Sequence, residues 1–367
     1  MKSKARVIAL YLPQYHPIPE NDLHWGKGFT EWTNVAQAKP LYKGHYQPRI
    51  PKDLGFYDLR LSEIREAQAS LAKEAGVEGF MYWHYWFGKG KMLLEKPFQE
   101  VLRSGKPDFP FCLGWANHSW TTKTWEKGKA FSGDTMIMEQ KYPGEKDIID
   151  HFNYLLPAFL DKRYITIDDK PVFGVYSPKD LKNFSLLKKI WTEMAIDNGL
   201  EGIHFVGMRS GRGFSVEDCF NLGYDAVNTR NNWEAECKEI GNKWIKMART
   251  FLSKHNFSLS LMKYNYSSII KHLNCEENKE VNVYPTIIPG FDRTARSKRK
   301  AVIYHGSTPE LFYNHVKDMI GNLKYKPEDK KVLFLMSWNE WGEGNYMEPD
   351  LKFGKEYIKA LSKALNE

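Results

Sequence analysis

The chain of 367 residues contains little cysteine and no long apolar run. Its four cysteines form no C-x-x-C pair, and no histidine lies near them at the spacing of a zinc site, so we expect no metal. This low cysteine content is typical of a reducing compartment. The apolar run at residues 7–12 ends at Pro13 and is too short for a signal peptide or a membrane helix. We therefore expect a cytoplasmic protein, at most loosely attached to a membrane surface.

Motifs that bind nucleotides are also missing. The sequence has no D-x-D pair to hold a metal with nucleotide phosphates, and no G-x-G-x-x-G after an apolar run. Gly211-x-Gly213 could hold a phosphate, but two glycines near the end of a strand are a weak indication. We therefore expect no cofactor.

Composition points to a globular protein that is rich in aromatic residues. Hydrophobic residues make up 42% and charged residues 27%, whereas aromatic residues reach 14% and include 12 Trp. Such an excess favours a cleft lined by aromatic rings, and a large aromatic core is the alternative. The net charge is +8, and a basic run at residues 293–300 is either a solvated loop or a contact for phosphate, acidic polymers or anionic membranes. Aromatic residues do not alternate with these cations, so we expect no nucleic-acid partner.

Apolar runs alternate with amphipathic stretches along the whole chain. The predicted strands are residues 6–12, 76–83, 110–116, 171–177, 202–208, 226–229, 282–288 and 331–338. The predicted helices include residues 61–74, 186–197, 261–273 and 309–322. This alternation predicts an α/β fold, a (β/α)8 TIM barrel with extended βα loops that forms a single domain over residues 1–367. An open doubly wound sheet is the alternative. The polar segment at about residues 230–280 predicts an inserted helical subregion, which could act as a lid.

Polar and aromatic residues follow most of the predicted strands. The first strand leads into residues 13–16 and then 24–34, the second into residues 84–86, and the third into residues 115–120. Because the carboxyl ends of barrel strands meet on one face, we expect these side chains to gather at one site.

The segment at residues 337–349 carries two carboxylates, Glu340 and Glu343, directly after the last predicted strand. An E-x-x-E spacing usually marks a solvated helix face. Here Gly342 and Gly344 interrupt helical periodicity, and Trp338 and Trp341 are costly residues for a solvated turn. Two carboxylates beside aromatic rings are what chemistry at a sugar requires, because one group handles protons while the other attacks or activates.

These turns together resemble the WbsX-type proteins of bacterial polysaccharide loci, a group similar to glycoside hydrolase family 99, the endo-α-mannosidases and mannanases. The likeness covers most of the chain, and its most specific pieces are residues 29–32 (F-T-E-W), 115–117 (W-A-N), 289–292 (P-G-F-D) and 338–344 (W-N-E-W-G-E-G). The last piece, with Glu348 and Pro349, is similar to the family 99 motif N-E-W-x-E-G-x-x-x-E-P.

The resemblance implies a (β/α)8 barrel and a metal-free reaction that retains the anomeric configuration. It makes Glu340 the base on the sugar 2-hydroxyl, which gives a 1,2-anhydro intermediate, and Glu343 the acid/base at the glycosidic oxygen. Glu343 should then have a raised pKa. Gly342 stands where the hydrolases usually have His and Asn345 where they usually have Thr, so the likeness does not extend to mannose specificity.

We therefore predict Glu340 and Glu343 as catalytic residues. The predicted substrate-binding residues are Tyr15, His16, Trp25, Trp32, His84, Trp86, Trp115, Asn117, Trp120, Arg209, Asp292, Arg293, Trp338, Asn339 and Trp341. For the Trp and His residues plain packing is the alternative, and Asp292 and Arg293 could instead form a structural salt bridge.

Three functions remain open on this sequence. We prefer a retaining glycosidase or transglycosidase that acts on a bacterial surface or exported glycan, with an oligosaccharide or polysaccharide as partner. The alternative is a glycosyltransferase that extends lipopolysaccharide O-antigen or capsule. The third is a glycan-binding protein without catalysis. Each of these could meet a lipid-linked glycan.

Overall fold

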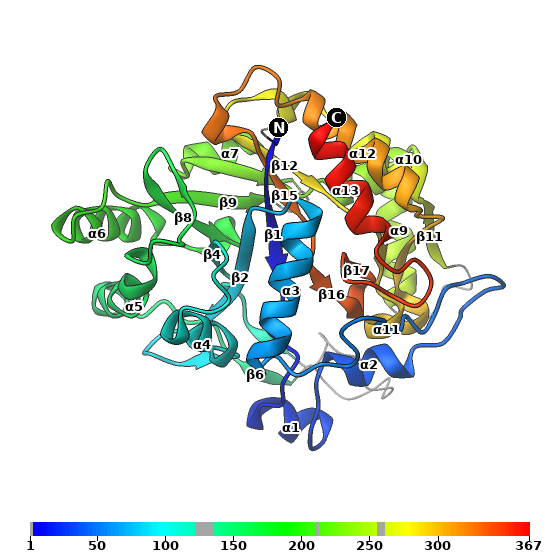
Figure 1. Cartoon of the computed structure of the whole chain (residues 1–367), viewed down its shortest axis with the longest axis horizontal. Coiled ribbons are helices and arrows are strands. Elements are labelled where there is room, and N and C mark those ends of the chain that lie inside the picture. The colour runs from blue at the N-terminus through cyan, green and yellow to red at the C-terminus, as the bar shows by residue number, and fades with distance from the viewer. Residues whose placement is uncertain (1–2, 122–134, 210–212, 255–260) are drawn as a thin grey trace.

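Eight parallel strands form a closed barrel in the computed structural model, which describes residues 3–121, 135–209, 213–254 and 261–367. The strands are β1 Arg6–Tyr11, β2 Gly79–Trp86, β4 Phe111–Trp115, β8 Lys170–Val175, β9 His204–Arg209, β10 Ala226–Thr229, β12 Val283–Ile287 and β15 Val332–Leu335. They follow one another around the barrel in chain order, and β1 closes it by pairing with both β2 and β15 (Figure 1). The (β/α)8 prediction is confirmed, and the open-sheet alternative is excluded.

The barrel strands are apolar on both sides because both sides are covered. Every residue of β2 and of β15 is buried, which is the pattern of parallel strands between a barrel interior and an outer helical layer. The surrounding helices are α3 Ser62–Ala75, α4 Lys96–Ser104, α5 Glu145–Phe159, α6 Phe184–Asp197, α7 Val216–Asn221, α12 Pro309–Gly321 and α13 Glu356–Asn366. At the start of α12, Pro309 occupies the first turn as predicted, and the Thr308 hydroxyl accepts a hydrogen bond from the Leu311 amide at 3.2 Å.

The segment between β10 and β12 contains α8 Asn232–Ile240, α9 Lys243–Lys254, β11 Met262–Asn265, α10 Tyr266–Leu273 and the 3-10 helix η3 Glu276–Lys279. The predicted helix at residues 261–273 is wrong in its first part, which forms strand β11. Met262 and Tyr264 alternate as buried residues, and β11 pairs in parallel with β14 Val302–His305. The Asn265 side chain then caps α10 by accepting from the Ser267 amide at 3.1 Å. Strand pairing has therefore overridden the helical pattern.

Long connections gather at the carboxyl ends of the strands. They contain α1 Pro19–Trp25, α2 Glu31–Gln37, β3 Met92–Leu93, β5 Trp120–Thr121, β6 Met136–Met138, β13 Phe291–Asp292, α11 Thr294–Ser297, β16 Asn339–Glu340, η6 Trp341–Glu343 and β17 Asn345–Tyr346. Figure 1 shows α1, α2, β6 and β16 at the end of the barrel opposite the two chain termini. This is the end at which a barrel of this type places its site.

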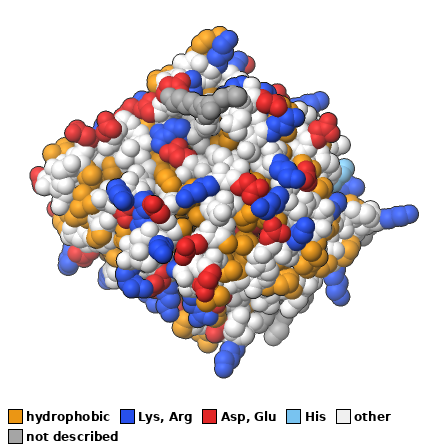
Figure 2. Space-filling model, viewed as in Figure 1, with side chains coloured by type: hydrophobic (Ala, Val, Ile, Leu, Met, Phe, Trp, Pro, Cys, Tyr) orange, Lys and Arg blue, Asp and Glu red, His pale blue; other side chains and the backbone are white. Residues whose placement is uncertain are grey.

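The outer surface mixes charges of both signs. On the face shown in Figure 2, basic and acidic side chains are interspersed with hydrophobic ones. Such a mixture is ordinary for the exterior of a globular protein. Within the described residues, every helix is too short or too polar to span a lipid bilayer.

Candidate active site

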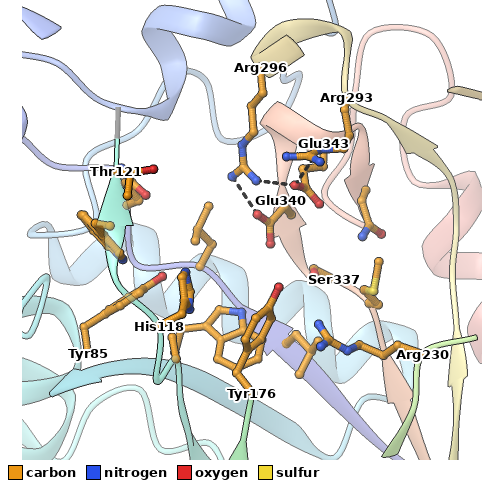
Figure 3. A pocket seen from close by; sticks show the side chains of 18 of the residues that line it. Tyr85, His118, Thr121, Tyr176, Arg230, Arg293, Arg296, Ser337, Glu340 and Glu343 are labelled. Atoms are coloured by element: carbon orange, nitrogen blue, oxygen red, sulfur yellow. Dashed lines mark hydrogen bonds and ion pairs between the residues drawn. The ribbon is translucent and has the colours of Figure 1, made fainter. Parts of the chain in front are cut away.

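A cavity of about 200 Å³ opens at the carboxyl ends of the barrel strands. Its aromatic walls come from Trp83, Tyr85, Trp120 and Tyr176, and its charged groups are Arg230, Arg293, Arg296, Glu340 and Glu343 (Figure 3). Rings on the walls and carboxylates at one side are the groups that bind a pyranose, which has an apolar face and hydroxyl edges.

Arg296 holds the two glutamates together. Its Nη1 lies 2.6 Å from Oε1 of Glu343, and its Nη2 lies 2.7 Å from Oε1 of Glu340 (Figure 3). Arg293 approaches the same Glu343 oxygen at 3.2 Å. Since both carboxylates contact one guanidinium, they converge at a short separation, and a short separation is typical of retaining glycosidases.

A third carboxylate, Glu31, lies behind this pair. It is the first residue of α2 and is fully buried, and its two oxygens lie 3.1 and 3.0 Å from Nε and Nη2 of Arg296. Gly342 makes room for it, because a Cβ atom at that position would come within 1.5 Å of the Glu31 Oε1. The Glu31 carboxylate therefore occupies space that only a glycine at position 342 leaves open.

Burial is the largest influence on all three carboxyl groups and raises their pKa values. For Glu343 the charges of Arg293 and Arg296 outweigh burial and bring the pKa below its ordinary value. Glu340 keeps a raised pKa, because Arg296 only partly offsets burial and Glu343 adds repulsion. The pKa of Glu31 is raised to about 7. The pKa of Glu343 therefore shifts in the direction opposite to the expected one, whereas the pKa values of Glu340 and Glu31 are raised.

The family model of glycosyltransferase WbsX matches residues 7–361 of this sequence. The chain belongs to the WbsX family. It is 33% identical over 363 residues to the uncharacterized protein WxcX of Xanthomonas campestris pv. campestris, in strain B100 and in strain ATCC 33913. The match covers 98% of this chain and 50% of each relative, so the chain spans about half the length of the curated relatives that it matches.

Solved structures of glycoside hydrolases share this WbsX fold. A glycoside hydrolase-like protein superposes with a TM-score of 0.61 at 16% identity, covering 100% of this chain and 94% of that one. The GH99 endo-α-mannosidase of Bacteroides thetaiotaomicron, in complex with bis-tris-propane, gives a TM-score of 0.57 at 14% identity and covers 100% and 98%. The resemblance to the WbsX proteins is confirmed as membership of that family, and the resemblance to family 99 is confirmed as a shared fold.

Four predicted site residues of this WbsX protein line the cavity, namely Glu340, Glu343, Arg293 and Trp120. Arg293 pairs with Glu343, and the predicted Asp292–Arg293 bridge is replaced by other partners. The Asp292 side chain is 1% exposed and accepts hydrogen bonds from His45 and Gln47, both at 2.8 Å. Asp292 therefore anchors the loop that contains these two residues, and this is a correction to its predicted contact with sugar.

A second group of predicted residues holds the turn that contains Glu340 and Glu343 in place. The Asn339 side chain accepts from the Leu12 amide at 2.8 Å and donates to the Leu12 carbonyl at 3.0 Å. The Tyr15 hydroxyl donates to the Asn339 carbonyl and accepts from the Trp341 amide at 3.2 Å. These contacts fix the turn against the end of β1. Trp32, Trp338 and Trp341 are buried in the same core, and the rings of Trp32 and Trp341 lie 5.5 Å apart.

His84, Trp86 and Trp115 lie away from the cavity. His84 contacts His151 of α5 at 2.8 Å, Trp86 stacks on the His151 ring at 4.5 Å, and Trp115 meets the same ring edge-on at 4.9 Å. Side chains alternate along a strand, so His84 and Trp86 point toward the outer helices while their neighbours Trp83 and Tyr85 line the cavity. The prediction ended this strand at residue 83 and placed His84 and Trp86 in the following turn, whereas β2 continues to Trp86 and directs both side chains outward.

The remaining predicted residues contact the protein itself. Asn117 bonds both the amide and the carbonyl of Ser177, at 2.8 and 2.9 Å, and so ties the end of β4 to that of β8. Arg209 donates to the Phe214 carbonyl at 2.7 Å. His16 contacts the Pro17 carbonyl at 3.1 Å, and the Trp25 ring lies 5.7 Å from that of Phe29. Gly211 and Arg212, of the weak phosphate motif, lie outside the described residues.

Sequence reasoning missed Glu31 and Arg296 as site residues. Glu31 lies in the F-T-E-W piece of the resemblance, which was the available indication. Arg296 lies in the basic run at residues 293–300, for which a solvated loop and a contact for anions were the two interpretations. Its side chain is only 8% exposed, because three carboxylates surround it. In the part of the chain that the structure describes, His, Cys, Asp and Glu do not form a cluster fit for a metal ion.

Proposed function

We propose that this chain is a retaining glycosidase or transglycosidase that acts on a bacterial surface or exported oligosaccharide or polysaccharide. The observation that supports it most is the convergence of Glu340 and Glu343 on one guanidinium beside an aromatic-walled cavity. Retaining enzymes need two carboxyl groups close enough to act on the same anomeric carbon. The fold shared with family 99 hydrolases is consistent with this chemistry.

The two glutamates take different roles because their surroundings differ. The resemblance to family 99 makes Glu340 the base and Glu343 the acid/base. The charges favour the reverse, since Arg293 and Arg296 keep Glu343 ionised and burial raises the pKa of Glu340. We therefore assign the proton donated to the glycosidic oxygen to Glu340, and the ionised base to Glu343.

Substrate contacts in this proposal come from the cavity walls. Trp83, Tyr85 and Trp120 offer ring faces and edges to the sugar. Arg230 lies across the cavity from the glutamates, above the Tyr176 ring at 4.4 Å (Figure 3). Its guanidinium can donate hydrogen bonds to hydroxyl or acidic oxygens of the glycan.

The test uses purified protein with a panel of bacterial oligosaccharides and polysaccharides, and with aryl glycosides of the sugars that are cleaved. Glycan cleavage should fall by about a hundredfold or more in Glu340→Gln and in Glu343→Gln, while Glu310→Gln on the exposed face of α12 retains full activity. A good leaving group needs no proton, so the aryl glycoside should restore activity to the variant that lacks the acid, which we expect to be Glu340→Gln. Cleavage that persists in both variants would refute the assignment.

A glycosyltransferase of lipopolysaccharide O-antigen or capsule synthesis is the second candidate, favoured by the description of the family as glycosyltransferase WbsX. The same preparation would be mixed with nucleotide sugars and a glycan acceptor. Acceptor-dependent release of nucleotide would support the transferase. Glycan binding without turnover in either assay would support the third option, a binding protein.

A further inference from the structure

Helix α9 (Lys243–Lys254) turns a polar side toward the protein. Lys246 is 1% exposed, and its Nζ bonds the Glu236 carboxylate and the Tyr264 hydroxyl, the latter at 2.8 Å. The Thr250 hydroxyl donates to the Lys246 carbonyl at 2.8 Å on the same side. A surface helix normally buries its apolar side and exposes its lysines, so the orientation of α9 is inverted.

The opposite side of α9 exposes an apolar stripe. Its members, with their exposed fractions, are Trp244 66%, Ile245 50%, Met247 49%, Phe251 60% and Leu252 42%. Residues three, four and seven apart are neighbours on a helix, so these five side chains form one continuous surface. Contiguous exposed apolar surface of this kind marks a site for another molecule.

Cations flank this apolar stripe. Lys243 and Arg249 lie at its two borders, the Lys243 Nζ is 5.4 Å from the Trp244 ring, and residues 243–254 contain no Asp or Glu. An apolar stripe that contains Trp and Phe between basic residues is typical of helices that lie in the headgroup region of anionic bilayers. The core of a protein–protein interface is by contrast depleted in Lys.

We propose that α9 is an interfacial helix that binds the surface of an anionic lipid membrane through the apolar stripe, with Lys243 and Arg249 at the headgroups. The stripe enters the acyl boundary, and the bonds of Lys246 to Glu236 and Tyr264 keep the helix attached to the protein. The proposal does not depend on the glycan chemistry, since it rests on α9 alone.

The test is co-sedimentation of the full chain with vesicles of phosphatidylcholine alone and of phosphatidylcholine with phosphatidylglycerol. The wild type should sediment with the anionic vesicles, and added salt should weaken this binding. Trp244→Ser combined with Phe251→Ser should weaken it by about tenfold or more, because two rings no longer enter the bilayer. Leu23→Ser combined with Tyr325→Ser is the matched control, since these exposed apolar residues lie outside α9. Circular dichroism verifies that both pairs fold.

Three outcomes would overturn the proposal: a wild type that leaves anionic vesicles in the supernatant, a Trp244/Phe251 variant that binds like the wild type, or equal binding to neutral and anionic vesicles. Size-exclusion chromatography adds a further one. If the wild type self-associates without binding vesicles and the Trp244/Phe251 variant is a monomer, the stripe is an interface between copies of the chain. Loss of glycan cleavage in Glu343→Gln tests the proposed function separately, because that residue lies outside α9.

Discussion

The absence of a side chain at position 342 determines how many carboxylates surround Arg296. Glu31 Oε1 occupies the volume that a Cβ would take, and Arg296 Nε lies 3.0 Å from the same point. Any residue larger than glycine must therefore move Glu31 or Arg296. Since Arg296 also holds Glu340 and Glu343, the acid pair would lose its shared partner.

We accordingly predict that Gly342→Ala lowers glycan cleavage at least about tenfold and costs about 2 kcal/mol or more in unfolding free energy, through overpacking and a broken buried ion pair. Gly321→Ala is the matched control, because no atom lies within 4 Å of a Cβ at that helical position. Initial rates and thermal melting would measure both effects. Equal behaviour of the two alanine variants would contradict the role given to Gly342.

Glu31 makes stability depend on pH. Its carboxyl ordinarily titrates near 4.5, and in the folded protein its pKa is raised to about 7 by burial, which the charge of Arg296 only partly offsets. Between these values the folded protein holds a proton that the unfolded chain has lost. The resulting stabilisation is complete below pH 4.5 and is lost as the pH rises through 7.

The unfolding free energy of the wild type should therefore fall between about pH 5 and about pH 8, and Glu31→Gln should reduce this fall by about 2 kcal/mol. Urea denaturation at the two pH values measures this difference. Glu348, whose pKa burial also raises to about 7, should contribute a separate share that Glu348→Gln removes, because Trp341, Gln68 and Tyr57 hold its carboxyl away from Arg296. If Glu31→Gln left the dependence of unfolding free energy on pH unchanged, the raised pKa of Glu31 would be excluded.

Among the elements, β13 and the loop after α2 depend on one buried carboxylate. Asp292 accepts hydrogen bonds from His45, Gln47 and the Thr294 amide. Burial alone would raise the pKa of Asp292, but His45 and Arg49 outweigh it, so the pKa lies well below its ordinary range. Since Asp292 does not line the cavity, we interpret it as a structural anchor rather than a sugar contact.

Asp292→Asn should cost about 2 kcal/mol or more of unfolding free energy, because the amide cannot accept all of these bonds or balance a charged partner. The control is Asp53→Asn, an exposed aspartate on the same side of the barrel, which should change stability little. Chemical denaturation measures stability, and titration with a cleaved glycan measures affinity. A variant that keeps its stability but loses glycan affinity would restore Asp292 to the binding site.

The strand β2 shows where a sequence pattern becomes ambiguous. The run at residues 79–86 is apolar or aromatic throughout, so its composition does not reveal which alternate residues face the interior. Trp83 and Tyr85 face the cavity, whereas His84 and Trp86 pack against His151. The first part of the helix predicted at residues 261–273 is a strand instead, because its partner strand lies about forty residues further along the chain.

At the scale of the whole molecule, the barrel was predictable because each strand coincides with an apolar run in the sequence. All eight predicted strands form, with ends that differ from the predicted ones by at most three residues, as at β2 and at the end of β15. The acid pair was predictable too, since Glu340 and Glu343 are three residues apart. The pairing of Glu31 with Arg296 was not, because 265 residues separate them and only closure of the barrel brings them together. The lowered pKa of Glu343 was not predictable either, because it depends on the charges of Arg293 and Arg296, which lie more than forty residues earlier in the chain.

A crystal structure with a bound imino sugar tests the central claim most directly, because its protonated nitrogen mimics the charge that develops at a sugar during glycoside cleavage. The account predicts that the ring occupies the cavity, with its nitrogen within hydrogen-bond distance of Glu340 or Glu343 and a ring face against Trp83, Tyr85 or Trp120. A sugar bound elsewhere, with both glutamates still bonded to Arg296 and no ligand before them, would contradict it.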